Sequence, residues 1–501
     1  MTYGQNVPTG TEGLDYVLNG GLPKERIVLL WGEPGCGKTT LGLQFLLEGA
    51  RRNERVLYLP LTQTRSELDE VLASHGWSAQ GMTIVEQPES IREGTVGDQT
   101  LFSSEDVELP EIADGILEAI RRYRPERLVL DSITELLMLA ENSYQFYRHI
   151  LKIKQELTRQ ACTTLFLSSG GPDDNRAIHT LVHGVIHLVH DSQRFGPAHR
   201  WLEVTKMRAR QFRGGHHDFH IQTGGLQVYP GIHGGPDRTQ VTKDVVGSGN
   251  VELDQLLGGG LEEGTTCMLL GPAGTGKSTL ASIYAEAAAE RGIRSAIFCF
   301  DEREDVFLKR SDSLGLKIRR YVAEGLVDLK EFHSGELFAG EFLALVRKKV
   351  EQEGARLVII DSMTGYLSAT PEDDTERTRQ LHQILKYLGR AGVLTFLIMT
   401  SHGILGQQRF ILDLSYVADT VLMLKHFEAE GQVRKCLWVI KKRYGRHESG
   451  IRELVIQEGG IHVGPPLSEF SGVLSGEPTF AGQKRVLHHS PQSPNPSTGL
   501  A

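Results

Sequence analysis

The sequence is poor in cysteine and has no long apolar runs. Its 501 residues include only five cysteines, none of them in a Cys-x-x-Cys motif, which argues against a disulfide framework and a structural zinc site. No apolar run reaches the roughly 18 residues that a membrane helix needs, and the N-terminus lacks the basic start and apolar core of a signal peptide. We therefore expect a cytosolic protein that does not enter a membrane.

The chain is mildly acidic and has no excess of positive charge. The chain has 54 lysines and arginines against 63 aspartates and glutamates, so its formal net charge is −9. Because nucleic acids and anionic membranes select extended basic surfaces, this balance makes both unexpected as partners. The hydrophobic fraction of 40% is ordinary for a globular chain, and the length predicts roughly two to four domains.

Three closely spaced histidines, His183, His187 and His190, invite a metal-binding interpretation. They fall within or beside the apolar run over residues 182–189, which has the character of a buried strand. We therefore favour a structural role for them over a metal site.

The chain contains a repeat of itself. A Gly-Gly-Leu turn at Gly20 returns at Gly259, and a glycine-rich loop around Lys38 returns around Lys277. Both pairs are 239 residues apart, a spacing that chance does not preserve across two motifs. The sequence therefore predicts two copies of one domain over residues 1–232 and 233–487. The Pro- and Ser-rich tail over residues 488–501 is predicted to be disordered.

Each copy alternates short apolar runs with helical patterns. In the first copy, runs at 27–31 and 56–59 flank a helical stretch at 40–50. Buried strands separated by helices predict an α/β fold, in which a mostly parallel sheet is flanked by helices. The first copy has two further strand-like runs, at 128–130 and 164–167. The second copy repeats the pattern, with strand-like runs at 266–270, 296–300, 357–360 and 394–399 and a helical stretch at 280–289.

Each copy also carries the pattern Gly-x-x-x-x-Gly-Lys-[Ser/Thr] between a strand and a helix, a specific signal for phosphate binding. Glycines let backbone N–H groups wrap a phosphate, and the helix N-terminus adds the positive end of its dipole. A glycine-rich turn without a ligand is the alternative, and two matches argue against it. The predicted ATP-binding residues are Gly32, Glu33, Pro34, Gly35, Cys36, Gly37, Lys38, Thr39 and Thr40, and in the second copy Gly271, Pro272, Ala273, Gly274, Thr275, Gly276, Lys277, Ser278 and Thr279.

The same motifs predict a Mg²⁺ site in each copy. Thr39 and Ser278 are expected to hold the ion through their hydroxyl groups, next to the lysines that reach the β- and γ-phosphates. Asp131 and Asp361 each end an apolar strand, and we expect them to assist the metal through water. A helix-capping role for the two aspartates is the alternative.

A base near the γ-phosphate is predicted in the second copy only. Asp301 and Glu302 directly follow an apolar strand, so two carboxylates stand at a strand end beside the phosphate loop. The matching stretch of the first copy has Thr62 and Gln63, and an amide orients water but does not take a proton. We therefore expect ATP binding in both copies and doubt hydrolysis in the first. An ordinary solvated strand end is the alternative for the acidic pair.

Together these features resemble the KaiC family, RecA-like ATPases known from bacterial circadian clocks. The resemblance rests on the duplicated opening [Thr/Ser]-Gly-x-x-x-Leu-Asp-x-x-Leu-x-Gly-Gly-Leu, the phosphate loops and the Asp-Ser strand ends, and it covers roughly residues 5–480. It implies two tandem RecA-like P-loop NTPase domains, a homohexamer with ATP between subunits, and a catalytic pair at Asp301 and Glu302.

The resemblance also implies that a neighbouring subunit contributes a Lys-x-Arg pair from a late strand. The first copy has Lys206 and Arg208, and the second has Lys441 and Arg443. A cation entering from another chain stabilises negative charge that develops on the γ-phosphate, and it links hydrolysis to assembly. A solvated basic strand end is the alternative interpretation.

Members of this family phosphorylate adjacent hydroxyl residues in their second domain. The resemblance aligns Ser415 and Tyr416 with these positions, so one hydroxyl matches and the other is a phenol. Residues 470–479 resemble the loop through which the C-terminal tail of the family is regulated. The tail that follows is unlike the one that docks the KaiA activator, which argues against KaiA, and a KaiB-like partner on the first domain stays open.

Three functions remain as alternatives. The first is a hexameric ATPase with serine/threonine-type autokinase activity in its second domain, acting in clock-like or signalling regulation. The second is a binding module whose partner is selected by the bound nucleotide, without phosphorylation. The third is a RecA-like nucleic-acid motor, which the acidic charge and the lack of an extended basic loop disfavour.

Overall fold

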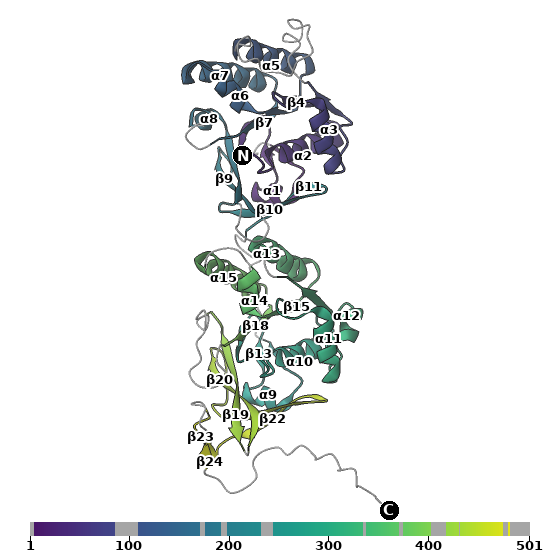
Figure 1. Cartoon of the computed structure of the whole chain (residues 1–501), viewed down its shortest axis with the longest axis vertical. Helices are drawn as coiled ribbons and strands as arrows, with labels where there is room; N and C mark the ends of the chain where they lie inside the picture. Colours follow the sequence, from purple (N-terminus) through teal and green to yellow (C-terminus); the bar gives the residue numbers. More distant parts are fainter. Residues whose placement is uncertain are drawn as a thin grey trace, which may run out of the picture. The chain divides into compact units, whose positions relative to one another are not determined.

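The structure, a computed structural model, describes residues 5–85, 109–170, 176–191, 198–231, 244–333, 337–369, 374–401, 417–429, 431–473 and 479–480. The chain divides into two compact units between residues 233 and 234 (Figure 1). Each unit is built on one large sheet, as the duplicated sequence predicts. Among the residues described, no helix has both the length and the apolar character needed to span a bilayer.

The first sheet has nine strands in the described part of the chain, and six adjacent strands run parallel to one another. The last three strands along the chain extend the sheet in antiparallel fashion. In spatial order the strands are β11 (Gly225–Tyr229), β10 (His217–Gln222), β9 (His199–Met207), β8 (Gly184–Asp191), β3 (Ile27–Trp31), β7 (Thr163–Ser168), β6 (Arg127–Asp131), β4 (Val56–Pro60) and β5 (Met82–Ile84).

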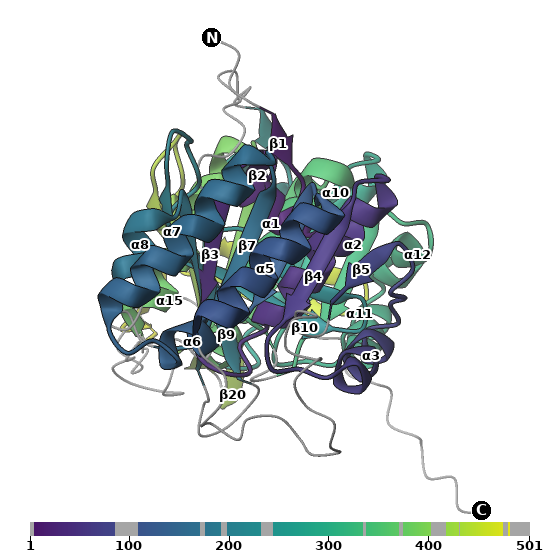
Figure 2. The same cartoon turned by 90° about the horizontal axis from the view of Figure 1, so that it is seen from above.

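Helices cover both faces of this sheet. Strand residues alternate between two hydrophobic clusters: Val28 and Leu30 pack on the side of α2, and Leu29 packs on the side of α5 and α7. Figure 2 shows α5 and α7 crossing one face of the strands. The elements besides the sheet are α1 (Glu12–Val17), α2 (Lys38–Arg51), α3 (Arg65–Ser74), α5 (Leu109–Tyr123), α6 (Ile133–Met138), α7 (Ser143–Arg159) and α8 (Arg176–Leu181), with a small β1 (Asn6–Val7)–β2 (Leu22–Pro23) pair.

The second sheet repeats the order of the first, strand for strand. In the same direction, its spatial order is β22 (Gly460–Pro466), β21 (Arg452–Gln457), β20 (Gln432–Lys442), β19 (Thr420–Ala429), β14 (Thr266–Gly271), β18 (Leu394–Thr400), β17 (Leu357–Asp361), β15 (Ser295–Cys299) and β16 (Val327–Glu331). Two small antiparallel pairs, β12 (Val245–Val246)–β13 (Leu261–Glu262) and β23 (Phe470–Ser471)–β24 (Thr479–Phe480), lie outside it.

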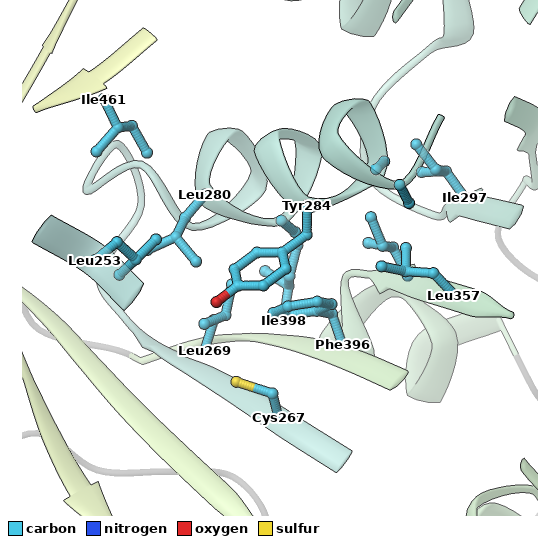
Figure 3. Packing of buried hydrophobic residues seen from close by; sticks show 14 of the residues in the cluster. Leu253, Cys267, Leu269, Leu280, Tyr284, Ile297, Leu357, Phe396, Ile398 and Ile461 are labelled. Carbon is cyan, nitrogen blue, oxygen red and sulfur yellow. The ribbon is translucent and has the colours of Figure 1, made fainter. Parts of the chain in front are cut away.

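Several helices of the second unit occupy the same places in the element order as helices of the first, with α12 and the turn η1 as additions in the described chain. Helix α10 (Lys277–Glu290) packs its alanine-rich face on the sheet, where Tyr284 contacts Phe396 with ring centroids 4.8 Å apart (Figure 3). Both residues are fully buried. The remaining helices are α9 (Val251–Leu256), α11 (Glu304–Ser313), α12 (Ile318–Ala323), α13 (Ala339–Arg347) with a π-helical turn η1 (Lys348–Gln352), α14 (Met363–Ala369) and α15 (Asp374–Arg390).

The predicted α/β fold of two tandem RecA-like domains is confirmed. The helices that follow the glycine loops begin at the lysines, two or three residues earlier than the hydrophobic pattern predicts, because Gly37 and Gly276 serve as left-handed N-caps. The histidine-rich run is strand β8, with His183 just before its start. His187 stacks on Trp31, and the described part of the chain holds no cluster of His, Cys, Asp or Glu suited to a metal ion.

Candidate functional site

The two glycine-rich loops join the central strand of each sheet to the following helix. In the first unit the loop connects β3 to α2, and in the second it connects β14 to α10. Both loops have the same backbone: φ is 80° at Gly35 and 76° at Gly274, and 100° at Gly37 and Gly276. Such left-handed positions turn successive backbone N–H groups toward one point, which makes an anion-binding concavity.

Tight packing beneath each loop explains the last glycine. A Cβ added at Gly276 would lie 2.2 Å from Cδ1 of Ile456, and one at Gly37 would lie 2.7 Å from Cδ1 of Ile221. Both isoleucines come from the antiparallel extension of the sheet. The antiparallel extension of each sheet therefore packs directly against the phosphate loop.

The loop lysines lie inside the loops. Nζ of Lys38 donates to the carbonyl oxygens of Gly32 and Glu33 at 2.8 and 2.9 Å. Nζ of Lys277 does the same to Gly271 and Pro272 at 2.8 and 2.7 Å, and burial lowers the pKa of Lys277 to about 8. Asp361 acts on the ammonium group of Lys277 only through space, while the hydrogen bonds above hold it against backbone carbonyls. Phosphate oxygens fit that position.

Beside each lysine, a hydroxyl group meets the buried aspartate of a neighbouring strand. Oγ1 of Thr39 donates to Oδ2 of Asp131 at 2.7 Å, and Ser278 hydrogen-bonds to Asp361 in the same way. Burial raises the pKa of Asp131 and raises the pKa of Asp361 to about 6, while these hydrogen bonds oppose the rise. Hydroxyl and carboxylate oxygens are the ligands that Mg²⁺ prefers, so both sites fit that ion.

The acidic pair after β15 is divided between two partners. Asp301 accepts a hydrogen bond from Ser362, at the start of α14, and Glu302 forms an ion pair with Arg310 on α11. The backbone N–H of Gly365 also donates to Oγ of Ser362, at 3.1 Å. Asp301 therefore holds the turn that follows β17, whereas Glu302 is the carboxylate of the pair that faces a cation.

The matching place in the first unit has no carboxylate. Gln63 lies 3.0 Å from the hydroxyl of Tyr58, which donates to Oδ2 of Asp131 at 2.8 Å. Burial and the neighbouring Asp131 raise the pKa of Tyr58 far above its usual range, so the phenol stays neutral. The second unit has Ile297 at the place of Tyr58, a side chain that offers no hydroxyl group to Asp361.

The Lys-x-Arg pairs lie at the opposite edge of each sheet from the loops. Lys441 pairs with Val421, which is level with Met268 near the start of β14, while the loop follows Gly271 at its end. At about 3.3 Å per residue this separates them by about 10 Å along the strand. The first unit repeats the arrangement, with Lys206 opposite Val185 and Gly184 level with Val28. The pair is therefore not directed at the loop of its own domain.

These cations have local partners at that edge. Nζ of Lys441 donates to the carbonyl of Ala418 at 2.8 Å, and Arg443 forms an ion pair with Asp419 at 2.9 Å, with its side chain 48% exposed. Arg208 donates to the carbonyl of Thr180 at 3.0 Å. The exposure of Arg443 leaves its guanidinium accessible to a second molecule.

Two predicted features lie outside the described residues. Ser415 and Tyr416 precede the point at which the described chain resumes, at Val417, and the tail over residues 488–501 follows the last described strand. The predictions on these residues therefore remain predictions.

Sequence reasoning missed three residues that the structure brings to the sites: Tyr58, Arg310 and Ser362. Tyr58 is signalled by its position, because it lies on β4, the strand that ends just before Thr62 and Gln63. Arg310 is eight residues from Glu302 and belongs to another element, so only the packing of α11 reveals the contact. Ser362 follows Asp361 directly, but its hydrogen bond to Asp301 crosses between strands.

Comparison with known proteins agrees with this geometry. The family model for the KaiC ATPase matches residues 7–232 and again residues 246–468. The circadian clock oscillator protein KaiC of Parasynechococcus marenigrum (strain WH8102) is 27% identical over 491 residues, which cover 95% of this chain and 93% of that protein. KaiC of Picosynechococcus sp. (strain ATCC 27264 / PCC 7002 / PR-6) is 24% identical over 489 residues, covering 95% and 92%.

A third relative is the circadian clock protein KaiC3 of Synechocystis sp. (strain ATCC 27184 / PCC 6803 / Kazusa). It is 23% identical over 497 residues, which cover 96% of each chain. The family model matches both units, and each unit has the phosphate loop, the buried lysine and the strand-end aspartate in one arrangement. This chain therefore belongs to the KaiC ATPase family and is an ATP-binding protein with two KaiC-type domains.

Proposed function

We propose that this protein is a homohexameric ATPase in which the second domain hydrolyses ATP and the first binds it without efficient turnover. The observation that carries the proposal is the difference at one strand end, Glu302 in one copy and Gln63 in the other. In this proposal ATP is bound by both phosphate loops. Mg²⁺ is held by Thr39 and Ser278, with Asp131 and Asp361 beside them.

Glu302 is the proposed general base of the second site. It follows β15, whose neighbour β17 ends at Asp361, and the carboxyl ends of parallel strands meet at the edge where the phosphate loop lies. A carboxylate there can accept the proton of an attacking water or hydroxyl group. Lys277 holds the phosphate oxygens, and bound Mg²⁺ would neutralise negative charge on them. Asp301 supports the same turn through Ser362.

The first site supports a different role. Tyr58 occupies one oxygen of Asp131, and Gln63 offers no group that takes a proton. A site that binds ATP and retains it suits a nucleotide-controlled binding surface, such as one for a KaiB-like partner. This second function applies to the first domain alone.

Assembly supplies the remaining charge in this proposal. Lys441 and Arg443 face away from their own phosphate loop, and the guanidinium of Arg443 is half exposed. In a ring of subunits these cations serve the γ-phosphate of a neighbour, and Lys206 and Arg208 do so in the first ring. Within the second ring, Ser415 is the proposed acceptor of a phosphoryl group and Tyr416 a second one, in clock-like or signalling regulation.

Each phosphate loop should bind one nucleotide independently. We expect Lys277→Ala to weaken ATP binding at the second site about tenfold or more, because the replaced ammonium group is the only side-chain cation inside the loop in the described structure. Lys38→Ala is the matched variant for the first site. Native mass spectrometry should count one nucleotide fewer per chain in each variant. Loss of both nucleotides in either variant would contradict independent sites.

Turnover should depend on Glu302. We expect Glu302→Gln to lower ATP hydrolysis about 10²- to 10⁴-fold, because the amide does not accept a proton. Phosphate release measured with saturating Mg·ATP checks this. Asp305→Asn, in the first turn of α11, removes an exposed partner of the N-cap residue Arg303; it is the control and should keep full turnover. Full activity of Glu302→Gln would assign hydrolysis to the first domain.

The trans role of Arg443 can be tested by mixing inactive chains. Glu302→Gln and Arg443→Ala should each be inactive alone. When they are mixed in equal amounts and allowed to exchange subunits, about a quarter of the interfaces combine an intact Glu302 with a neighbour's intact Arg443. The rate of ATP hydrolysis should therefore recover to about a quarter of the wild-type rate. If mass spectrometry shows mixed rings and no activity returns, the cation does not act across the interface.

Autophosphorylation should appear as added mass. After incubation with Mg·ATP, intact-mass measurement should show the gain of a phosphoryl group, and Ser415→Ala should reduce it while hydrolysis continues. Tyr416→Phe is the companion variant, and fragment spectra assign the modified residue. An unchanged mass in the wild-type chain would leave the nucleotide-controlled binding module as the function.

A further inference from the structure

A bidentate ion pair joins the proposed base to a residue outside every motif of the sequence. Nη2 of Arg310 lies 2.8 Å from Oε2 of Glu302, and Nε lies 3.1 Å from Oε1. Both side chains are about a quarter exposed, so the pair is partly shielded from water. Two parallel N–H···O bonds fix both the position and the plane of the carboxylate.

Arg310 is itself held in place. Its third nitrogen, Nη1, donates to Oγ1 of Thr279 at 3.3 Å, and Thr279 is buried in the first turn of α10, directly after Ser278. The guanidinium carbon lies 4.8 Å from the ring centroid of Phe307, a fully buried residue of α11. Arg310 therefore connects Glu302 to the helix that carries the phosphate loop.

The first unit provides an internal comparison. Helices α3 and α11 occupy equivalent places, and the 239-residue spacing pairs Arg310 with Val71 and Glu302 with Gln63. Val71 packs against the hydrophobic core, and Gln63 contacts Tyr58 instead. The copy that lacks the carboxylate thus also lacks the arginine, although Thr40 stands where Thr279 does. The arginine and the glutamate occur together, as expected if one serves the other.

Arg310 also offers a positive charge to a group of neighbouring carboxylates. The charges of Glu302 and Asp301 raise the pKa of Asp361 in addition to burial, and Arg310 lowers it. Without the cation, like charges would drive Glu302 toward solvent. A base displaced by about 1 Å loses on the order of 10²-fold in rate.

We propose that Arg310 is a positioning residue for the ATPase reaction of the second domain: it orients Glu302 and couples it to the phosphate-loop helix. It acts through Glu302 and is not itself the base. This inference rests on the proposed role of Glu302 in hydrolysis. It makes the second site a unit of four residues, in which Thr279 and Phe307 hold Arg310 and Arg310 holds the base.

The test compares Arg310→Met and Arg310→Lys in the full-length protein. Methionine keeps the packing on Phe307 without charge, and lysine keeps the charge without the two-point fork. Lys309→Met, on the same helix with only an exposed partner at Asp305, is the control. Hydrolysis of Mg·ATP is measured as kcat and KM. Native mass spectrometry and thermal unfolding follow nucleotide content and folding.

We expect Arg310→Met to lower kcat about 10- to 100-fold, with KM within about threefold of the wild-type value. The kcat of Arg310→Lys should lie between those of Arg310→Met and the wild type, and the kcat of Lys309→Met should equal the wild-type value. In the Glu302→Gln background, Arg310→Met should cause no further loss, because the arginine acts only through the carboxylate.

Other outcomes overturn the inference. A wild-type or higher kcat for Arg310→Met would show that the ion pair does not position the base. A further loss in the Glu302→Gln background, or a lost nucleotide, would show a structural role instead. If Glu302→Gln alone keeps full turnover, the proposed function fails. Loss of activity in Glu302→Gln but not in Arg310→Met would refute the positioning role alone.

Discussion

In each unit, parallel strands buried on both faces bring their carboxyl ends to one edge of the sheet, and the chemistry of this protein depends on that constraint. The phosphate loop leaves β14 there, Asp361 ends β17 there, and Glu302 follows β15 at the same edge. The hydrogen bond between Ser278, in the first turn of α10, and Asp361 connects the loop that follows β14 to the end of β17, although β18 lies between these two strands in the sheet. Elements far apart in the sequence thereby lie together beside the phosphate loop.

The two units share this geometry and differ in their charges. Both hold a lysine inside the loop and a hydroxyl group against a buried aspartate. In the first unit, however, the aspartate is also hydrogen-bonded by Tyr58, while in the second Glu302 faces Arg310. The duplicated backbone thus carries different side chains beside the same loop geometry, because the strand ends differ while the glycines of the loop keep their conformation.

The same constraint sends the Lys-x-Arg pairs to the far edge. Strand β20 runs antiparallel to β19, so its end lies level with the start of β14 and not with the phosphate loop. The half-exposed guanidinium of Arg443 lies at that edge, away from the phosphate loop of its own domain. In the proposed ring, assembly and hydrolysis are coupled for this geometric reason, and a subunit alone would lack part of the charge that stabilises the transition state.

The sequence by itself determined the duplication, the α/β fold and the place of both phosphate loops, because these depend on local spacing and on motifs such as the one around Lys277. It also located the acidic pair, since a strand end is visible as an apolar run followed by charge. Only the tertiary structure decided that Asp301 holds Ser362 while Glu302 meets Arg310, and that Tyr58 contacts Asp131. These contacts join separate elements, and their distances depend on how helices pack on the sheet, which residue spacing alone does not specify.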